Sequence, residues 1–234
     1  MSTYKGYLIQ EDGDSYIGSI KSIDIPIVQD QHVLINVEFS SLNYKDALSA
    51  SGPKYGVTRD YPFVPGIDAA GRILESKSPN FNIGDEVIVT GYSMGMSVFG
   101  GFGEIVHVPA NWVVKLPKNM SLKESMNYGT AGLTAAASVR KIIDNGIDEK
   151  KPILVSGATG GVGSVAVNIL SKLGYEVHAL TGKNNEDIFL KTIGADSVVN
   201  RDDFIQDPVR PLDKALYGGA VDTVGGDILA KIIS

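Results

Sequence analysis

The chain has 234 residues, of which 43% are hydrophobic and 21% are charged, a composition typical of a soluble globular protein. Its formal net charge of −6 disfavours a broad nucleic-acid surface, because such a surface needs clustered positive charge. The complete absence of cysteine excludes disulfides and thiolate-ligated zinc sites.

The first residues, MSTYKGYLIQEDGDS, lack an apolar core flanked by basic residues, so they do not resemble a signal peptide. No apolar run approaches the ~20 residues that a membrane span needs. We therefore expect a cytoplasmic protein whose partner is a small-molecule substrate, and neither a nucleic acid nor a membrane.

Up to about Pro117 the pattern is one of short β segments between turns, which is typical of a small barrel or sandwich. The expected strands are Val33–Phe39, Gly71–Leu74, Glu86–Val89, Ile105–Val108 and Trp112–Leu116. The polar trio Tyr44-Lys45-Asp46 follows the first of them, and its residues alone favour an ordinary turn.

From Ser121 the pattern becomes helical, with a capping box at Ser121 and Glu124 and an alanine-rich helix at Leu133–Ile143. Strands and helices then alternate, which predicts a parallel sheet with crossover helices. The expected strands are Ile153–Val155, Glu176–Leu180, Val198–Val199 and Ala220–Val224. The expected helices open at Gly163, at Glu186 (capped by Asn184 or Asn185) and at Asp227. We place the domain boundary between residues 120 and 121.

The turn after Val155 carries the strongest chemical signal in the chain. Its motif residues are Gly157, Thr159, Gly160, Gly161, Val162 and Gly163. Glycines at this spacing let a diphosphate approach the backbone, and the following helix points free N–H groups and a positive dipole end at it. Because the loop lies between a buried strand and an amphipathic helix within Pro152–Leu173, we interpret it as a dinucleotide-binding site.

The end of the second strand of this unit indicates which dinucleotide is bound. NAD sites place an acidic residue there for the ribose 2′-hydroxyl, whereas this chain has Thr181, Gly182 and Lys183. A hydroxyl, an open backbone and a cation suit a 2′-phosphate, so we predict NADP(H) as the cofactor. Lys183 could equally be a solvated loop lysine, and Arg201 could either reach the adenosine end or pair with a neighbouring aspartate.

Several segments together resemble the zinc-independent quinone oxidoreductase branch of the medium-chain dehydrogenase/reductase superfamily, in its quinone oxidoreductase and acryloyl-CoA reductase group. They are SSLNYKDAL (Ser40–Leu48), YPFVPGIDAAG (Tyr61–Gly71), GDEVIVTG (Gly84–Gly91), GTAGLTAA (Gly129–Ala136), GATGGVGS (Gly157–Ser164) and GAVDTVGG (Gly219–Gly226). The resemblance covers essentially the whole chain. It implies a GroES-like β-barrel domain over residues 1–120, followed by a Rossmann doubly wound parallel sheet over residues 121–234.

The resemblance also implies roles for single residues, at an active site in the cleft between the two domains. Tyr44 would lie near cofactor and substrate, Asn43 would shape the same pocket, and Thr130 would lie near the nicotinamide. The diphosphate would be held by the glycine loop, and the phosphorylated ribose end by Thr181, Gly182, Lys183 and Arg201.

The only histidines, His32, His107 and His178, are scattered along the sequence and predict no zinc site. Without a metal, oxidation of an alcohol is disfavoured, whereas hydride addition to an alkene conjugated to a carbonyl needs only hydrogen-bond donors at the developing enolate. We therefore expect an NADPH-dependent enzyme that reduces an enoyl-CoA such as acryloyl-CoA, an enone or a quinone. Lys54 and Arg59 could bind the phosphates of a CoA substrate or be solvated surface charges.

Members of the resembled family continue past residue 234, so we expect a Rossmann sheet that is incomplete at the C-terminus. The alternative is therefore a protein that binds NADPH without catalysis, or an inactive fragment of such an enzyme. The edge at Ala220–Val224 would invite pairing with another chain, and a homodimer is the oligomer that the family suggests.

Overall fold

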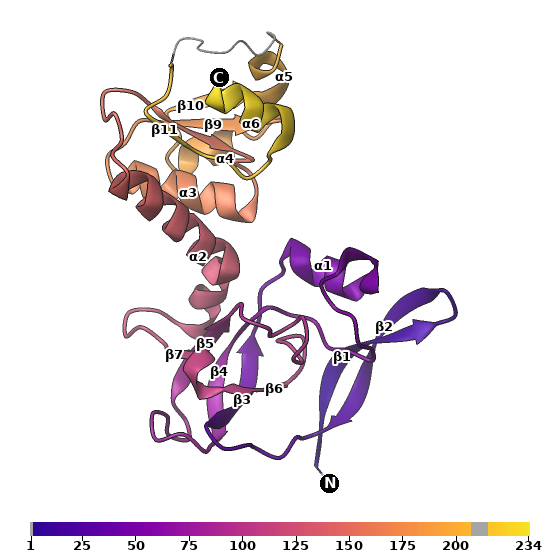
Figure 1. Ribbon diagram of the computed structural model, residues 1–234. Coiled ribbons are helices and arrows are strands. Elements are labelled where there is room, and N and C mark those ends of the chain that lie inside the picture. The colour runs from indigo at the N-terminus through magenta and orange to yellow at the C-terminus, as the bar shows by residue number, and fades with distance from the viewer. Residues whose placement is uncertain (1, 207–214) are drawn as a thin grey trace. The chain divides into compact units, whose positions relative to one another are not determined.

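The computed structural model describes residues 2–206 and 215–234, and it divides into two compact units, Met1–Thr130 and Ala131–Ser234 (Figure 1). Helix α2 (Leu122–Asp144) runs from one unit into the other. Gly129 interrupts this helix with φ 48° and ψ −148°, a conformation open to glycine and rarely to other residues. The predicted capping box opens α2, because the Glu124 carboxylate accepts the Ser121 backbone N–H at 2.8 Å.

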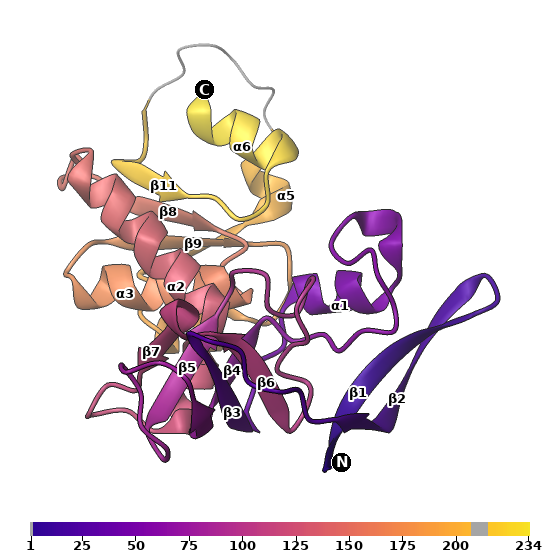
Figure 2. The same ribbon diagram turned by 60° about the horizontal axis from the view of Figure 1, so that its bottom comes forward.

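The first unit begins with a long hairpin that the sequence pattern did not predict. Strands β1 (Thr3–Asp12) and β2 (Ser15–Asp24) pair antiparallel along their whole length, and the turn contains Gly13 at φ 61°. Figure 2 shows this hairpin reaching away from the other strands of its unit. No residue of β2 is fully buried, so the strand lacks the alternating apolar pattern by which strands are recognised.

A five-stranded antiparallel sheet in the order β6-β3-β4-β5-β7 forms the centre of the first unit. Its strands are β3 (His32–Phe39), β4 (Asp68–Ser76), β5 (Glu86–Thr90), β6 (Ile105–Pro109) and β7 (Val113–Lys115). They overlap all five predicted strands, and their inward side chains, such as Val33, Ile73 and Val106, form the main apolar core of the unit. Two single-turn helices, η1 (Pro53–Tyr55) and η2 (Ala110–Trp112), lie in the connections.

Helix α1 (Tyr44–Ala50) follows β3, so the turn expected at Tyr44-Lys45-Asp46 is wrong. The Asp46 carboxylate accepts the backbone N–H of Asn43 at 2.8 Å and satisfies one of the donors at the helix start. An Asn followed three residues later by Asp is therefore the local signal that distinguishes this helix from a turn.

The second unit contains a parallel sheet in the order β10-β9-β8-β11. Its strands are β8 (Ile153–Ser156), β9 (Val177–Thr181), β10 (Ser197–Asn200) and β11 (Gly219–Val221). Its helices, besides the end of α2, are α3 (Gly161–Lys172), α4 (Asp187–Thr192), α5 (Arg201–Phe204) and α6 (Gly226–Ile233).

Helices cover both faces of this sheet. Ile153 and Val155 of β8 face a core that α2, α3 and α4 complete, whereas Leu154 between them packs with Ile228 of α6. Alternate residues of one strand thus enter opposite layers, which explains why β8 is an unbroken apolar run. The expected doubly wound Rossmann arrangement is confirmed.

Several boundaries differ from the predictions by a few residues. Helix α3 begins at Gly161 rather than Gly163, and β11 ends at Val221 rather than Val224. The N-cap of α4 is Glu186, while Asn185 lies in the left-handed region at φ 64°. None of the helices within residues 2–206 and 215–234 combines the length and apolar character needed to cross a membrane.

Strands β3 and β4 approach each other closely at Gly71. A Cβ at this position would lie 1.8 Å from the Asn36 carbonyl oxygen, next to an irregularity in the strand pairing. We predict that Gly71→Ala lowers the free energy of unfolding in urea by about 1–3 kcal/mol, because the strands must separate to admit the methyl group. Gly219→Ala is the control, since its Cβ would meet nothing nearer than 3.6 Å. Equal stability of the two variants would contradict this explanation.

His32 and His107 are diagonal neighbours on the paired strands β3 and β6, with ring centroids 5.0 Å apart. Burial lowers the pKa of His107 from its ordinary value of 6.5, and His32 lowers it further, while Glu75 partly opposes the shift. The native state therefore binds fewer protons than the unfolded chain between the lowered pKa and 6.5, and stability is lost as the pH falls through this window.

Urea unfolding of the wild type and of His107→Gln, measured from about pH 8 to about pH 5, tests this linkage. We predict that the substitution removes part of the wild-type loss of stability below the ordinary histidine pKa. Parallel profiles for the two proteins would mean that His107 makes no such contribution.

Candidate functional site

The glycine loop connects β8 to α3 and brings backbone atoms together at distances that side chains would forbid. Gly157 has φ 58°, and a Cβ on Gly163 would lie 2.3 Å from the Gly157 carbonyl oxygen. Gly160 and Gly161, at the start of α3, are exposed. The first N–H groups of a helix have no partner within it, so this end of α3 offers donors and a positive dipole end to an anion.

Three residues that the sequence reasoning missed hold this loop in place. The hydroxyl of the buried Ser156 donates to Asp222 at 2.5 Å, and it accepts the Thr223 backbone N–H at 2.9 Å. The Thr223 hydroxyl in turn donates to the Ser156 carbonyl at 2.9 Å. Asp222 also accepts the Gly225 backbone N–H at 2.9 Å, which turns the chain away from the sheet after Val221. The contacts join positions far apart in the sequence, so no local pattern predicts them.

The predicted 2′-phosphate residues gather at the carboxyl ends of β9 and β10. Thr181 ends β9, and its side-chain oxygen accepts the Lys183 backbone N–H at 3.1 Å. The Arg201 guanidinium covers Gly182, because a Cβ there would lie 2.8 Å from the Arg201 Cζ. Lys183 is exposed, and no carboxylate occupies positions 181–183.

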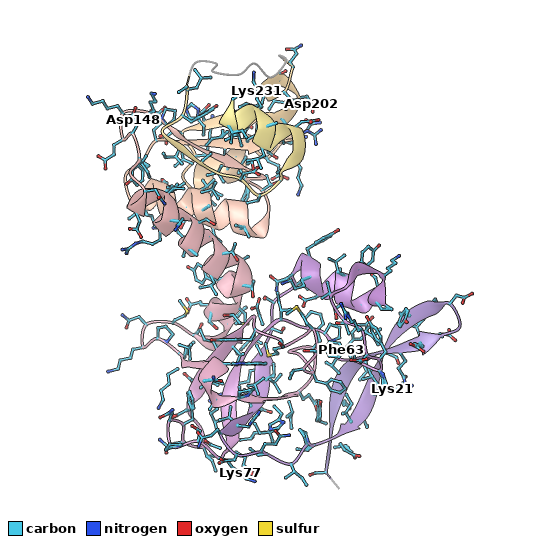
Figure 3. The ribbon with its side chains drawn as sticks, in the orientation of Figure 1. Lys21, Phe63, Lys77, Asp148, Asp202 and Lys231 are labelled. Atoms are coloured by element: carbon cyan, nitrogen blue, oxygen red, sulfur yellow. The ribbon has the colours of Figure 1, made fainter. Side chains whose placement is uncertain are left out.

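Arg201 also pairs with Asp202, its neighbour at the start of α5, through Nη2 at 2.9 Å. Asp202 lies at the surface, as Figure 3 shows. Arg201 thus forms the ion pair with Asp202, one of the two alternatives, and its guanidinium also lies over Gly182 just after β9. An anion at this position would have to compete with Asp202.

In the first unit, Asn43 and Thr130 meet at the carboxylate of Asp68, the first residue of β4. Asp68 has no exposed surface. Its Oδ2 accepts from Ser41 Oγ at 2.5 Å and from Asn43 Nδ2 at 2.8 Å. Thr130 donates through its hydroxyl to Oδ1 at 2.6 Å and through its backbone N–H to Oδ2 at 2.9 Å. No local pattern indicates this cluster, although Asp68 lies within the segment Tyr61–Gly71.

A second buried carboxylate, Asp46, lies on the other side of Asn43. It accepts the backbone N–H of Asn43 at 2.8 Å and that of Ile67 at 2.9 Å. Burial raises the pKa of Asp46, while these hydrogen bonds oppose the rise. Tyr44, the next residue, begins α1 with 82% of its surface exposed. The side chain that the family resemblance assigns to the substrate is thus exposed, on a helix whose start is fixed by buried groups.

The remaining candidate residues are separate from these clusters. Lys54 lies over the ring of Tyr55 and lines one surface hollow. Arg59 lines another hollow, together with Asp60. In the described part of the chain, no three histidine, aspartate or glutamate side chains gather in a way that could hold a metal ion. His32 and His107 adjoin each other, whereas His178 lies on β9 in the second unit.

Comparison with known families and proteins agrees with this architecture. Residues 29–118 match the alcohol dehydrogenase GroES-like domain. The chain is 44% identical to a Bacillus subtilis protein named "Putative quinone oxidoreductase YhfP", covering 100% of this chain and 71% of that one. It is 39% identical to acrylyl-CoA reductase AcuI of Ruegeria pomeroyi, covering 95% of this chain and 68% of the relative. The chain thus spans about 70% of the length of these relatives.

Solved structures place the fold in the same group. The YhdH oxidoreductase of Salmonella enterica, crystallised in complex with NADP, superposes with a TM-score of 0.91 at 39% identity. The match covers 97% of this chain and 70% of that one. The Bacillus subtilis YhfP structure has NAD bound and superposes with a TM-score of 0.92 at 43% identity, covering 99% and 70% of the two chains. The chain therefore belongs to the zinc-independent quinone oxidoreductase and acryloyl-CoA reductase branch of the medium-chain dehydrogenase/reductase superfamily.

Proposed function

We propose that this protein is an NADPH-dependent reductase of an activated carbon–carbon double bond, in an enoyl-CoA such as acryloyl-CoA or an enone, or of a quinone. The observation that carries the proposal is the open glycine loop at the start of α3, together with Lys183 after β9 and Arg201 after β10. The glycines leave the room that a Cβ would fill. Lys183 and Arg201 follow β9 and β10, and positions 181–183 hold no acid that would repel a 2′-phosphate.

The residues of the second unit fit the phosphate-bearing part of NADPH. Gly157, Thr159, Gly160, Gly161, Val162 and Gly163 would hold the diphosphate against the start of α3. Thr181, Gly182, Lys183 and Arg201 would hold the 2′-phosphate. Because one similar structure contains NADP and another contains NAD, the preference must be measured for this chain.

The residues of the first unit would act on the reacting groups. When bound, NADPH supplies a hydride, which adds to the β-carbon of the alkene while negative charge moves to the carbonyl oxygen of the substrate. Tyr44 would donate a hydrogen bond to that oxygen or contact the substrate, and solvent would protonate the α-carbon. Asn43 and Thr130 would shape the pocket at the reacting end.

The cation assignment predicts a selective loss of affinity. Lys183→Ala and Arg201→Ala should each weaken NADPH binding roughly ten- to a hundredfold, because a hydrogen bond to a charged group contributes about 1.5–3 kcal/mol. NADH binding should change little, since it carries no 2′-phosphate. Fluorescence titration of both nucleotides measures the effect, and Lys172→Ala, in the last turn of α3, is the control. Equal weakening of NADPH and NADH would contradict the assignment.

Catalysis is tested by following NADPH consumption with acryloyl-CoA, a simple enone and a simple quinone. We predict turnover with at least one of them, and about a tenfold or larger fall in kcat for Tyr44→Phe, which loses only the hydroxyl. The control is Tyr92→Phe, because Tyr92 is also exposed but stacks on Trp112.

Tight NADPH binding without consumption on any substrate would favour the alternative of a non-catalytic binding protein. Wild-type turnover by Tyr44→Phe would remove the Tyr44 hydroxyl from the mechanism.

A further inference from the structure

Asp68 connects three segments of the first unit that are distant in sequence. Its own strand is β4, Ser41 and Asn43 lie in the segment that leads into α1, and Thr130 lies in α2 directly after the kink. A carboxylate without exposed surface is costly unless donors compensate for the lost water. Here two hydroxyls, a side-chain amide and a backbone N–H provide that compensation.

Asn43 is directed into the protein by this arrangement. Its Nδ2 donates to Asp68 at 2.8 Å and to Ser41 Oγ at 3.1 Å, so both amide hydrogens have partners. Its backbone N–H donates to Asp46 at 2.8 Å. The residue immediately before Tyr44 is thus held at its side chain by one buried carboxylate and at its backbone by another.

The kink of α2 is fitted to the same carboxylate. A Cβ on Gly129 would lie 2.5 Å from Asp68 Oδ2 and 2.8 Å from Ser41 Oγ, and φ is 48°. Only glycine lets the helix bend here while the backbone N–H of Thr130 reaches Asp68. The bend, the buried charge and the position of Thr130 therefore depend on one another.

We propose that Asp68 is a positioning residue for the reduction, which fixes Thr130 and, through Asn43, the start of α1 that carries Tyr44. This inference rests on the proposed function, which assigns Tyr44 and Thr130 to the reacting end. Asp68 itself is buried and acts through these neighbours. Asn43 then shapes the pocket by positioning Tyr44.

Asp68→Asn tests the proposal at nearly constant volume. An amide accepts at only one of its two positions and presents N–H groups at the other, where donors already point. We expect kcat to fall about tenfold or more, because small displacements of reacting groups are costly. The Kd for NADPH should change less than about threefold, since the phosphate-binding residues lie in the second unit.

The deuterium isotope effect with NADPH labelled at the transferred position should rise, because misplacement makes hydride transfer more limiting. A loss of folded protein alone would leave the isotope effect unchanged. Asp85→Asn is the matched control, as Asp85 is an acid of the same unit that pairs with Lys115 at 2.8 Å. It should retain the wild-type kcat and isotope effect.

Hydrogen exchange tests the positioning without any turnover. In Asp68→Asn, amides of residues 41–50 and 126–134 should exchange faster than in the wild type, whereas those of β8 should not change. In Gly129→Ala the added methyl group would collide with the Asp68 carboxylate, so this variant should show the same exchange pattern.

The outcomes separate the two proposals. A wild-type protein that reduces none of the substrates would refute the proposed function, and the exchange experiment alone would then decide whether Asp68 holds these segments. Unchanged exchange would overturn the positioning role, whether or not turnover falls. Faster exchange with wild-type kcat and isotope effect would also overturn it, since Asp68 would then stabilise the fold without serving the reaction.

Discussion

The approach of α3 to the turn after β8 is the constraint on which the second unit depends. Gly163 lies so close to the Gly157 carbonyl that a single methyl group would separate helix from loop. Because the backbones pack directly, the start of α3 is brought to the carboxyl end of the sheet, where parallel strands of this kind bind their ligands. The Ser156–Asp222–Thr223 contacts then tie the loop to the segment after β11.

In the first unit, the segment that leads into α1 is held by buried polar groups instead. Two carboxylates, Asp46 and Asp68, lie on either side of Asn43 and collect backbone and side-chain donors. Each bond is modest alone, but a buried acceptor that loses its donors is expensive, so the segments around it are held together. In each unit, surrounding contacts therefore hold a candidate functional group in place. Buried carboxylates hold the helix start that carries Tyr44, and close backbone packing holds the glycine loop.

The sequence predicted the features that local rules determine. Periodicity and glycine spacing indicated β8, α3 and β9, because a buried strand, a tight turn and an amphipathic helix each leave a pattern within a few residues. The β1–β2 hairpin was not predicted, because β2 has no fully buried residue and therefore lacks the alternating apolar pattern of a strand. Helix α1 was predicted as a turn, because the local signal of Asn43 followed three residues later by Asp46 was not recognised as a helix start. The Asp68 cluster joins positions 41, 43, 68 and 130, which no local pattern connects.

Whether the chain selects the phosphorylated dinucleotide can be decided by calorimetric titration of the unmodified protein with NADPH and with NADH. In the proposed function the glycine loop holds the diphosphate of either nucleotide, so a difference in affinity would come from the residues proposed to surround the ribose, chiefly Lys183 and Arg201. NADPH should bind at least roughly tenfold more tightly than NADH, as expected for one charged hydrogen bond. Equal affinities, or a preference for NADH, would contradict it.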